Sequence, residues 1–231
     1  MTPETCVVIP FKDEAALTVA TLVRLRQEQH DLCLLYDNGS TDETRALVES
    51  AAREDDRVLV IPADGIGIYE MWNAGASLAL EYANPVNVAY LNNDLDWCPG
   101  MLSVLADHLR ADDRRGAVYP DWFRRVAEGV GSFSTQATEG TSRRLGMCGW
   151  CFMVRGEVPV PPIDTRLQWW CGDDFIEHHI RQLGYTVARV NGLPVDHILE
   201  ATASNGENDW THQAKDADLA YFESTYLGLT L

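Results

Sequence analysis

The sequence predicts an α/β fold in which a mostly parallel sheet is flanked by helices. Short apolar runs rich in β-branched residues begin at Cys6, Leu32, Val58 and Val86, so their starts lie 26, 26 and 28 residues apart. Helical patterns fill the intervals between the runs. This alternation is typical of βαβ units, and strands that are apolar throughout are typical of parallel strands buried on both faces.

The segments that connect these strands have the patterns of helices. We expect helices at residues 15–29, 42–52 and 68–83. Ser40, followed three residues later by Glu43, forms a capping box and predicts where the second helix begins. The turn before it, at residues 37–39, therefore lies at the carboxyl end of the second strand, the edge where open α/β sheets bind ligands.

The second half of the chain has a less regular pattern. Residues 127–146 are rich in Gly, Ser and Thr and predict a long loop. No internal repeat and no linker divides the chain, so we expect a single domain over residues 1–231. The elements expected after the loop are an apolar stretch at 147–154, a proline-rich turn, a helix at 175–183, a strand at 186–190 and a last helix at 211–226.

The net charge of the chain restricts the classes of partner that it can bind. The 231 residues include 35 Asp and Glu against 18 Lys and Arg, a formal net charge of −17. Such a surface repels polyphosphates and anionic lipid, which makes nonspecific nucleic-acid binding unlikely. No apolar run approaches the ~20 residues of a membrane span, and the start has no basic region of a secretory signal. We expect a cytoplasmic protein without a membrane span.

The six cysteines are expected to be reduced and mostly buried in apolar surroundings. Cys148 and Cys151 form a single CxxC pair. A zinc site needs four ligands, and no second pair stands at the usual spacing. The pattern therefore favours structural cysteines over a zinc site or a redox dithiol.

Polar clusters follow the predicted strands or begin the later helix. Each of them alone is typical of an ordinary turn or helix cap. Together they predict a ligand site, because several carboxylates gather at one edge of one sheet. They are Asp37, Asp64, the group Asn92, Asn93, Asp94 and Asp96, the pair Asp173 and Asp174, and the dipeptide Asp196-His197.

Seven segments, in their order and spacing, resemble the GT-A nucleotide-sugar glycosyltransferases, specifically the family-2-like group. The resemblance covers about residues 5–198 and implies a Rossmann-like sheet with a mixed C-terminal acceptor-side part. It implies a nucleotide-binding half at 1–100, an acceptor and catalytic half at 101–198 and a C-terminal helical extension at 199–231. The segments are VVIPFKDE, YDNGSTDET, GIYEMWNAG, LNNDLDWCPGML, GWCFMVRGE, WWCGDDFIEHHIRQLGY and VDHI.

The resemblance implies transfer of a sugar from a nucleotide-diphosphate donor to an acceptor. Asp37 would accept a hydrogen bond from a ring N–H of the base, assisted by Asn38, and main-chain groups around Pro10 and Phe11 would flank the base and ribose. Uracil, thymine and guanine all carry such an N–H, so a UDP-sugar is the first expectation and dTDP- and GDP-sugars stay open. The other donor-side residues implied are Asp64, Asn73, Asn92 and Asn93.

The same resemblance implies a metal site. Asp94 occupies the last position of the family's DXD motif, where a carboxylate meets Mn²⁺ or Mg²⁺ on the two phosphates. Asn92 stands at the first position in place of Asp, which lowers the charge of the site. Asp96 offers a shifted Asp-Leu-Asp motif, although the Pro-Gly pair at 99–100 favours Asp94. His197 matches a histidine that closes the metal site in many relatives, and a structural histidine is the alternative.

Asp173 and Asp174 fall where the family places its catalytic base. Inverting transfer needs a carboxylate that takes the proton of the acceptor. The spacing to Gly184 favours Asp173, whereas the Gly-Asp-Asp start of the helix favours Asp174, which we expect to be the base. The preceding Trp169 and Trp170 either stack on a sugar or belong to the core.

Two other functions compete with this interpretation. A sugar nucleotidyltransferase needs a glycine-rich, basic loop after the first strand, and the segment there, FKDEAAL, has no glycine. A catalytically inactive nucleotide-sugar-binding module would not need Asp94, His197 and the aspartate pair together. The acceptor stays open among a glycan, a protein and a small molecule, and a soluble acceptor is favoured.

Overall fold

The computed structural model describes residues 5–82, 87–121, 136–139, 146–198 and 209–228. Its strands are β1 (Thr5–Phe11), β2 (Leu32–Asp37), β3 (Val58–Pro62), β4 (Asn87–Leu91), β5 (Leu95–Trp97), β6 (Arg115–Pro120), β7 (Gln136–Glu139), β8 (Cys151–Val154), β9 (Thr186–Asn191) and β10 (Val195–His197). Its helices are α1 (Ala15–Leu25), α2 (Asp42–Ala52), α3 (Ile68–Tyr82), α4 (Met101–Arg110), α5 (Gly172–Gln182) and α7 (Asp209–Tyr226).

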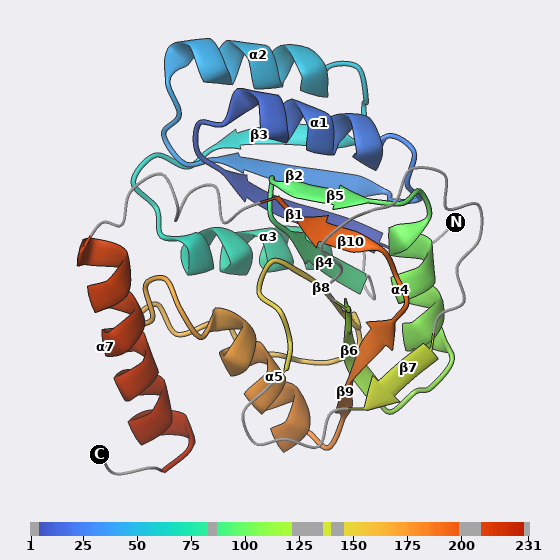
Figure 1. Ribbon diagram of the computed structural model, residues 1–231, viewed down its shortest axis with the longest axis vertical. Coiled ribbons are helices and arrows are strands. Elements are labelled where there is room, and N and C mark those ends of the chain that lie inside the picture. The colour runs from blue at the N-terminus through green and yellow to red at the C-terminus, as the bar shows by residue number, and fades with distance from the viewer. Residues whose placement is uncertain (1–4, 83–86, 122–135, 140–145, 199–208, 229–231) are drawn as a thin grey trace.

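The described strands form an eight-stranded sheet in the order β3-β2-β1-β4-β8-β6-β9-β7 and a separate pair, β10-β5 (Figure 1). Strands β1, β2, β3 and β4 are mutually parallel, as predicted. Phe11 on β1 lies opposite Asp37 on β2, and Asp37 lies opposite Pro62 on β3. The carboxyl ends of these three strands are therefore level, which brings the residues that follow them to one edge.

The part of the sheet beyond β4 is mixed, which confirms the expected α/β architecture. Strand β8 runs antiparallel between β4 and β6, β6 and β9 are parallel, and β7 is antiparallel to β9. Within the described residues the sheet continues across both halves of the chain. The strands of the second half of the chain are thus built onto the same sheet as β1 to β4.

Strand β7 corrects the expectation of an uninterrupted loop at 127–146. Its four residues, Gln136–Glu139, pair with β9, and the Asn191 side chain donates to the Gln136 carbonyl oxygen at 3.1 Å. A short polar edge strand carries no apolar pattern, because its main chain alone makes the ladder. Residues 127–135 and 140–145 of the expected loop lie outside the described part of the chain.

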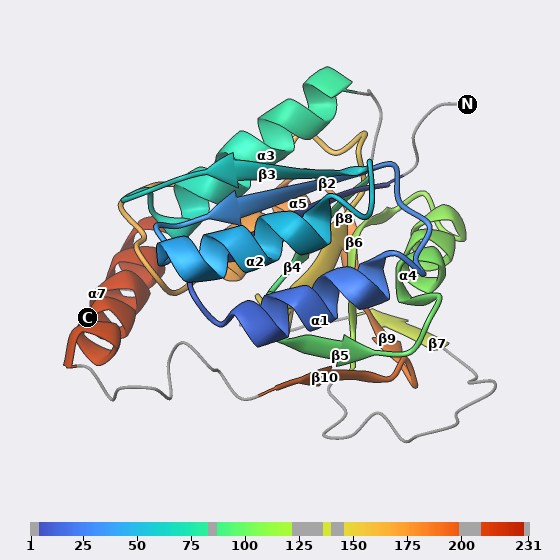
Figure 2. The ribbon, with the colours of Figure 1, turned by 90° about the horizontal axis from the view of Figure 1, so that it is seen from above.

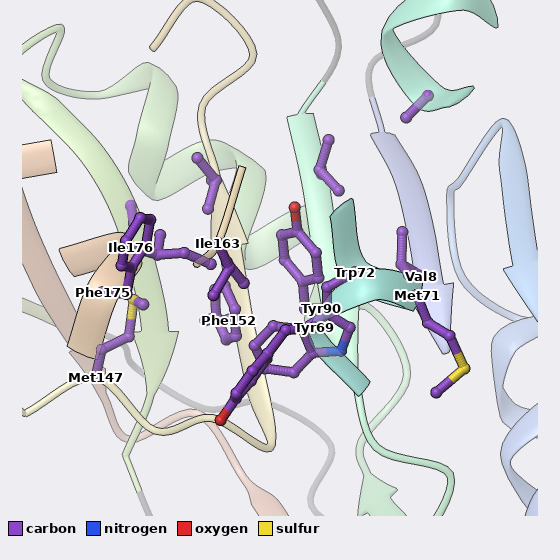
Figure 3. Close-up of a cluster of buried hydrophobic side chains, with 14 of the residues drawn as sticks. Val8, Tyr69, Met71, Trp72, Tyr90, Met147, Phe152, Ile163, Phe175 and Ile176 are labelled. Carbon is purple, nitrogen blue, oxygen red and sulfur yellow. The ribbon is translucent and has the colours of Figure 1, made fainter. Parts of the chain in front are cut away.

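Helices cover both faces of the sheet (Figures 1 and 2). Helices α1, α2 and α4 bury apolar side chains against one face, whereas α3, α5 and α7 pack on the other. On that second face the centroid of the Trp72 ring lies 5.2 Å from the centroid of the Tyr90 ring and 5.4 Å from that of Phe152 (Figure 3). These large rings contribute much of the apolar area that holds α3 on the sheet.

Three helices differ in their bounds from the predictions, and one of them, α7, begins at Asp209 rather than at residue 211. Helix α1 ends at Leu25 rather than at residue 29. Beyond it the main chain forms tighter turns, in which the Glu28 N–H donates to the Leu25 carbonyl oxygen, and the Glu28 side chain is buried. Its oxygens accept from the main-chain N–H of Gly100 at 2.8 Å and of Leu102 at 3.0 Å, at the start of α4. Helix α5 begins at Gly172, three residues before its predicted start.

The cysteines agree with the expectation that they are mostly buried. All six cysteines are free, and only Cys148 is not fully buried. Its thiol donates to the Cys151 carbonyl oxygen at 3.1 Å, and burial raises its pKa well above the ordinary value. No helix in the described ranges has the combination of length and apolarity that a bilayer crossing demands.

Candidate functional site

The predicted base-binding residues lie together where β1 and β2 end. The Asn38 N–H donates to the Phe11 carbonyl oxygen at 2.8 Å, and the Ala63 N–H donates to the Asp37 carbonyl oxygen at 2.8 Å. When the Asn38 amide is oriented so that its nitrogen faces two acceptors, it donates to the carbonyl oxygens of Ala63 (3.2 Å) and Ile66 (3.3 Å). These bonds fix the edge of the sheet that Asp37 occupies.

Arg45 belongs to this edge, although no pattern in the sequence singles it out. Its Nε atom donates to Asp37 Oδ2 at 2.6 Å, and its Nη2 atom lies 3.2 Å from Asp64 Oδ1. Asp37 Oδ1 accepts from the Ser40 N–H at 2.8 Å. Burial opposes ionisation of Asp37, but the bonds from Arg45 and Ser40 outweigh it and hold the pKa of the carboxyl below its ordinary value. Asp37 is therefore a carboxylate at neutral pH.

The capping box predicted for α2 is wrong by one residue. Thr41 is the N-cap, and its hydroxyl oxygen accepts from the Thr44 N–H at 3.4 Å. The Ser40 hydroxyl oxygen instead accepts from the Asp13 N–H at 2.8 Å, and Asp13 Oδ1 accepts from the Thr41 N–H at 2.9 Å. Asp13 and Glu14 both have φ of 53°, a left-handed conformation that only firm surroundings sustain in residues other than glycine. The Ser40 side chain is thus used to hold the turn after β1.

Asp94 and His197 meet at the start of the small sheet. Strand β10 pairs with β5 so that His197 lies opposite Leu95, and the Ile198 N–H donates to the Asp94 carbonyl oxygen at 2.8 Å. His197 Nε2 lies 3.1 Å from Asp94 Oδ1 and 3.2 Å from Asn92 Nδ2. The predicted metal residues Asp94 and His197 therefore present their ligating atoms side by side.

Two neighbours of Asp94 have contacts directed elsewhere. Asp96 forms an ion pair with Arg24 of α1 at 2.7 Å. The Asn93 side chain donates to the Thr18 hydroxyl at 2.8 Å, and the Thr21 hydroxyl donates to the Asn93 carbonyl oxygen at 2.8 Å. These bonds tie the turn after β4 to α1, and the predicted ligand roles of Asp96 and Asn93 stay predictions.

The donor set at Asp94 and His197 fits a hard divalent cation that is shared with a substrate. No group of three or more His, Cys, Asp or Glu side chains that could hold a metal occurs among the residues described. Mg²⁺ is usually held by one or two carboxylates together with substrate phosphates, so a two-residue protein set is adequate when a diphosphate supplies further oxygens. Asp94 supplies a carboxylate oxygen and His197 an imidazole nitrogen.

Asn73, predicted on the donor side, tethers a distant turn. Its amide nitrogen donates to the Ile163 carbonyl oxygen at 2.9 Å, and its amide oxygen accepts from the Ile163 N–H at 2.7 Å. This pair of bonds holds the proline-rich turn against α3. Its predicted donor contact stays a prediction.

The start of α5 is pressed against α3. The Gly172 N–H donates to the Tyr69 hydroxyl at 3.0 Å, and a Cβ atom on Gly172 would lie 2.0 Å from a ring carbon of Tyr69. Cys171, the N-cap, has φ of 68°. Asp173 and Asp174 occupy the first turn, where the helix dipole favours negative charge. Only glycine fits at 172, which fixes the position of both carboxylates.

A short turn connects the aspartate pair with the predicted metal residues. A Cβ atom on Gly149 would lie 3.1 Å from Asp173 Oδ2, so the main chain there runs directly past that carboxyl. The next residue, Trp150, stacks on the imidazole of His197 with ring centroids 5.6 Å apart. Burial, and then the charge of Asp174, raise the pKa of Asp173 to about 7. The carboxylate of Asp174 accepts a hydrogen bond from the Cys171 thiol.

Comparison with known proteins gives a family match. The sequence pattern of the family described as glycosyl transferase family 2 matches residues 6–148. No curated protein matches the chain.

Solved structures share the fold. One is GalNAc-T7 with UDP, GalNAc and Mn²⁺, with TM-score 0.65, 17% identity, and 85% of this chain and 43% of that chain covered. Another is the mannosyltransferase PcManGT from Pyrobaculum calidifontis with GDP-Man and Mn²⁺, with TM-score 0.60, 18% identity, and 84% and 58% covered. A third is glucosyl-3-phosphoglycerate synthase from Mycobacterium tuberculosis with Mn²⁺, UDP and glucosyl-3-phosphoglycerate, with TM-score 0.65, 16% identity, and 99% and 81% covered.

These likenesses show the GT-A glycosyltransferase fold. The chain spans about half the length of the first two structures, 43% and 58%. The fold predicted from the sequence motifs is therefore confirmed, and the roles of the individual residues stay predictions.

Proposed function

The chain belongs to glycosyl transferase family 2, and on this premise we propose that it transfers a sugar from a nucleoside-diphosphate donor to an acceptor with inversion at the anomeric carbon. One observation carries the proposal. Trp150 stacks on His197, and Gly149 abuts Asp173, so a single turn joins the candidate metal residues to the candidate base. Donor activation and acceptor deprotonation would then take place on the two sides of that turn.

The nucleoside would bind where β1, β2 and β3 end. Asp37, ionised because Arg45 and Ser40 lower its pKa, would accept the ring N–H of the base. Arg45 would offer a donor to an adjacent carbonyl oxygen of the base. An N–H beside a carbonyl is presented by uracil, thymine and guanine, so a UDP-sugar is the first candidate and dTDP- and GDP-sugars follow. Donor contacts are proposed also for Pro10, Phe11, Asn38, Asp64, Asn73, Asn92 and Asn93.

Asp94 and His197 would hold the divalent cation, Mn²⁺ or Mg²⁺. When bound, this ion supplies neutralisation of charge on the departing diphosphate. The Trp150 ring, stacked on the imidazole, would hold His197 in its orientation. Asp96 remains an alternative carboxylate in this proposal.

Asp174 would act as the general base. It would take the proton of the acceptor hydroxyl as the acceptor oxygen forms its bond to the anomeric carbon and the bond to the diphosphate breaks. The pKa of Asp173, raised to about 7, leaves this carboxyl partly protonated at neutral pH. Asp173 would position the acceptor or its partner carboxylate, and the measurements below compare the two residues.

Within this proposal, residues 1–100 bind the nucleotide, 101–198 carry the acceptor side and the base, and 199–231 extend it with a C-terminal helix. The acceptor is a glycan, a protein or a small molecule. The direct test is a thermal-shift panel of UDP-, dTDP- and GDP-sugars with and without Mn²⁺, followed by a nucleotide-release assay. We expect a metal-dependent shift with one nucleotide class and release of its nucleoside diphosphate.

The same assays separate the competing functions. An inactive binding module would show the shift but no nucleotide release, even with water as the acceptor. A nucleotidyltransferase would release pyrophosphate from a nucleoside triphosphate and a sugar 1-phosphate. Either result would overturn the proposed transfer reaction.

A further inference from the structure

One side of helix α1 is bonded to the turn that carries Asp94. Thr18, Thr21 and Arg24 stand three residues apart, which places them along one side of the helix, and α1 lies beside β5 (Figures 1 and 2). Thr18 and Thr21 are 0% and 1% exposed, so their hydroxyls are enclosed by protein. A buried hydroxyl is stable only when it is hydrogen-bonded, and both of these bond to Asn93, the residue directly before Asp94.

The two hydroxyls fix the main chain on the amino side of Asp94. The Thr21 hydroxyl donates to the Asn93 carbonyl oxygen at 2.8 Å, and the Asn93 amide nitrogen donates to the Thr18 hydroxyl at 2.8 Å. That carbonyl belongs to the planar peptide unit that joins Asn93 to Asp94, so its direction also sets the position of the Asp94 nitrogen. On the carboxyl side, the Ile198 N–H donates to the Asp94 carbonyl oxygen at 2.8 Å. Because both flanking peptide units are held, the direction of the Asp94 Cα–Cβ bond is fixed.

Arg24 acts on the strand pair that brings His197 to Asp94. Asp96 of β5 lies opposite Asp196 of β10, and carboxylates that face each other across a strand pair repel. Arg24 Nη2 lies 2.7 Å from Asp96 Oδ1 and neutralises one of the two charges. The ion pair therefore favours the pairing of β5 with β10, on which the 3.1 Å approach of His197 Nε2 to Asp94 Oδ1 depends.

We propose that Thr18, Thr21 and Arg24 are positioning residues, which orient the two candidate metal ligands toward a divalent cation. This inference rests on the proposed function, which assigns the cation to Asp94 and His197. Substitution of residues that hold metal ligands in place typically lowers metal affinity roughly 10–100-fold. A purely structural role of the threonines would need only side chains that fill space, and valine has nearly the shape of threonine without its hydroxyl.

The test is calorimetry on the intact protein with the nucleoside diphosphate that it binds best among UDP, dTDP and GDP, titrated with and without Mn²⁺. The ratio of the two affinities is the gain due to the metal. We expect Thr21→Val and Thr18→Val each to lower this gain about ten-fold and to leave the affinity without Mn²⁺ unchanged. Thr21→Ser keeps the hydroxyl and should keep most of the gain. If Thr21 only filled space, the order would be reversed, because valine preserves its volume and serine lacks its methyl group.

Arg24 is tested by a compensating pair of substitutions. Arg24→Gln should lower the gain due to the metal about three-fold, because the two facing carboxylates then repel. Asp196→Asn in the same chain removes one of those carboxylates and should restore the gain. A larger gain in Arg24→Gln would show instead that Arg24 withholds Asp96 from the metal, and would overturn its proposed role.

The matched control is Thr186→Val. The Thr186 hydroxyl also donates to a main-chain carbonyl oxygen, that of Arg114 at 3.4 Å, but it lies at the start of β9, so the gain due to the metal should not change. The inference is overturned if Thr18→Val and Thr21→Val retain the gain while Asp94→Ala abolishes it. A failure of the proposed function has a different result: the natural protein shows no gain from Mn²⁺, or Asp94→Ala retains it, which would remove the metal site and its positioning residues together.

Discussion

The guanidinium of Arg45 lies 2.6 Å from the carboxylate of Asp37 and joins the first turn of α2 to the end of β2. Asp37 is 1% exposed, so removal of its cationic partner would leave a buried charge. The pair therefore links the stability of the sheet edge with the ionised state of the residue that is proposed to read the base.

Arg45→Met should lower the free energy of unfolding by about 1–3 kcal/mol at pH 7, less than for a fully buried pair because Arg45 is partly exposed. The pKa of Asp37 is held below its ordinary value, so this stabilisation is present above about pH 4 and is lost as pH falls through the lowered pKa. Urea unfolding at pH 7 and pH 3 measures both effects. The control is Arg53→Met, whose exposed pair with Glu49 at 3.9 Å should contribute less than about 0.5 kcal/mol.

Asp94→Ala should abolish the metal-dependent part of nucleoside-diphosphate binding and leave the fold intact. The carboxylate is the proposed anionic ligand of the ion, and its loss removes both a charge and a coordinating oxygen. Calorimetry with UDP in the presence and absence of Mn²⁺ measures the effect. An unchanged affinity with Mn²⁺ would remove Asp94 from the metal site.

His197→Ala should weaken the same binding less than Asp94→Ala does. A neutral imidazole contributes no charge to the ion, and His197 Nε2 lies 3.1 Å from the Asp94 carboxylate that would remain. The same calorimetric titration gives the comparison. A loss equal to or greater than that of Asp94→Ala would contradict this arrangement of the site.

Asp174→Asn should lower kcat by about 10²–10⁴-fold, the usual range for a lost general base. Donor affinity should stay nearly constant, because the proposed role of this carboxylate concerns the acceptor. Asn keeps the shape of the side chain and removes its basicity. Asp173→Asn is the matched comparison and should be milder. If it is the more damaging of the two, the base is Asp173, and if neither matters, the inverting mechanism proposed here fails.

The sequence predicted the parts of the fold that local patterns determine. All four apolar runs of the first half became β1 to β4, and the polar residues after them stand at one edge because parallel strands end together. Strand β7 was missed because its four residues have no alternating apolar pattern, although their main chain pairs with β9 and the Asn191 side chain bonds to the Gln136 carbonyl oxygen and the Thr138 hydroxyl. The end of α1 was missed because Glu28 lies beyond the helix, where its carboxylate accepts a hydrogen bond from the Gly100 N–H beside α4. No local pattern indicates that contact.

The contacts that were missed depend on how the elements pack. Arg45 reads as an ordinary exposed helix residue, and although it stands only eight positions after Asp37, no sequence pattern pairs the two side chains. The Asp218 carboxylate accepts from the Gln168 N–H at 3.0 Å, and no spacing rule connects a helix carboxylate with a turn 50 positions away. Such tertiary partners are set by packing, which periodicity and capping patterns do not encode.

The stability of the protein between pH 5 and pH 8 should depend on the protonation of Asp173. Burial and the charge of Asp174 raise the pKa of Asp173 from an ordinary value near 4 to about 7. In that window the folded protein keeps a proton that the unfolded chain releases, so this group makes stability fall as pH rises toward 7 and level off above it. Asp173→Asn cannot ionise and removes that slope. The stability of Asp173→Asn relative to the natural protein should therefore be greater at pH 8 than at pH 5. Urea unfolding at the two pH values measures the difference.

Asp164→Asn is the control. The pKa of Asp164 is lowered by its hydrogen bonds, first from Arg166 and then from the hydroxyls of Tyr226 and Tyr221, which outweigh the opposing effect of burial. Asp164 therefore stays ionised at both pH values, and the effect of this substitution on stability should be the same at pH 5 and pH 8. Parallel changes for Asp173→Asn would show that its carboxyl titrates in the ordinary acid range.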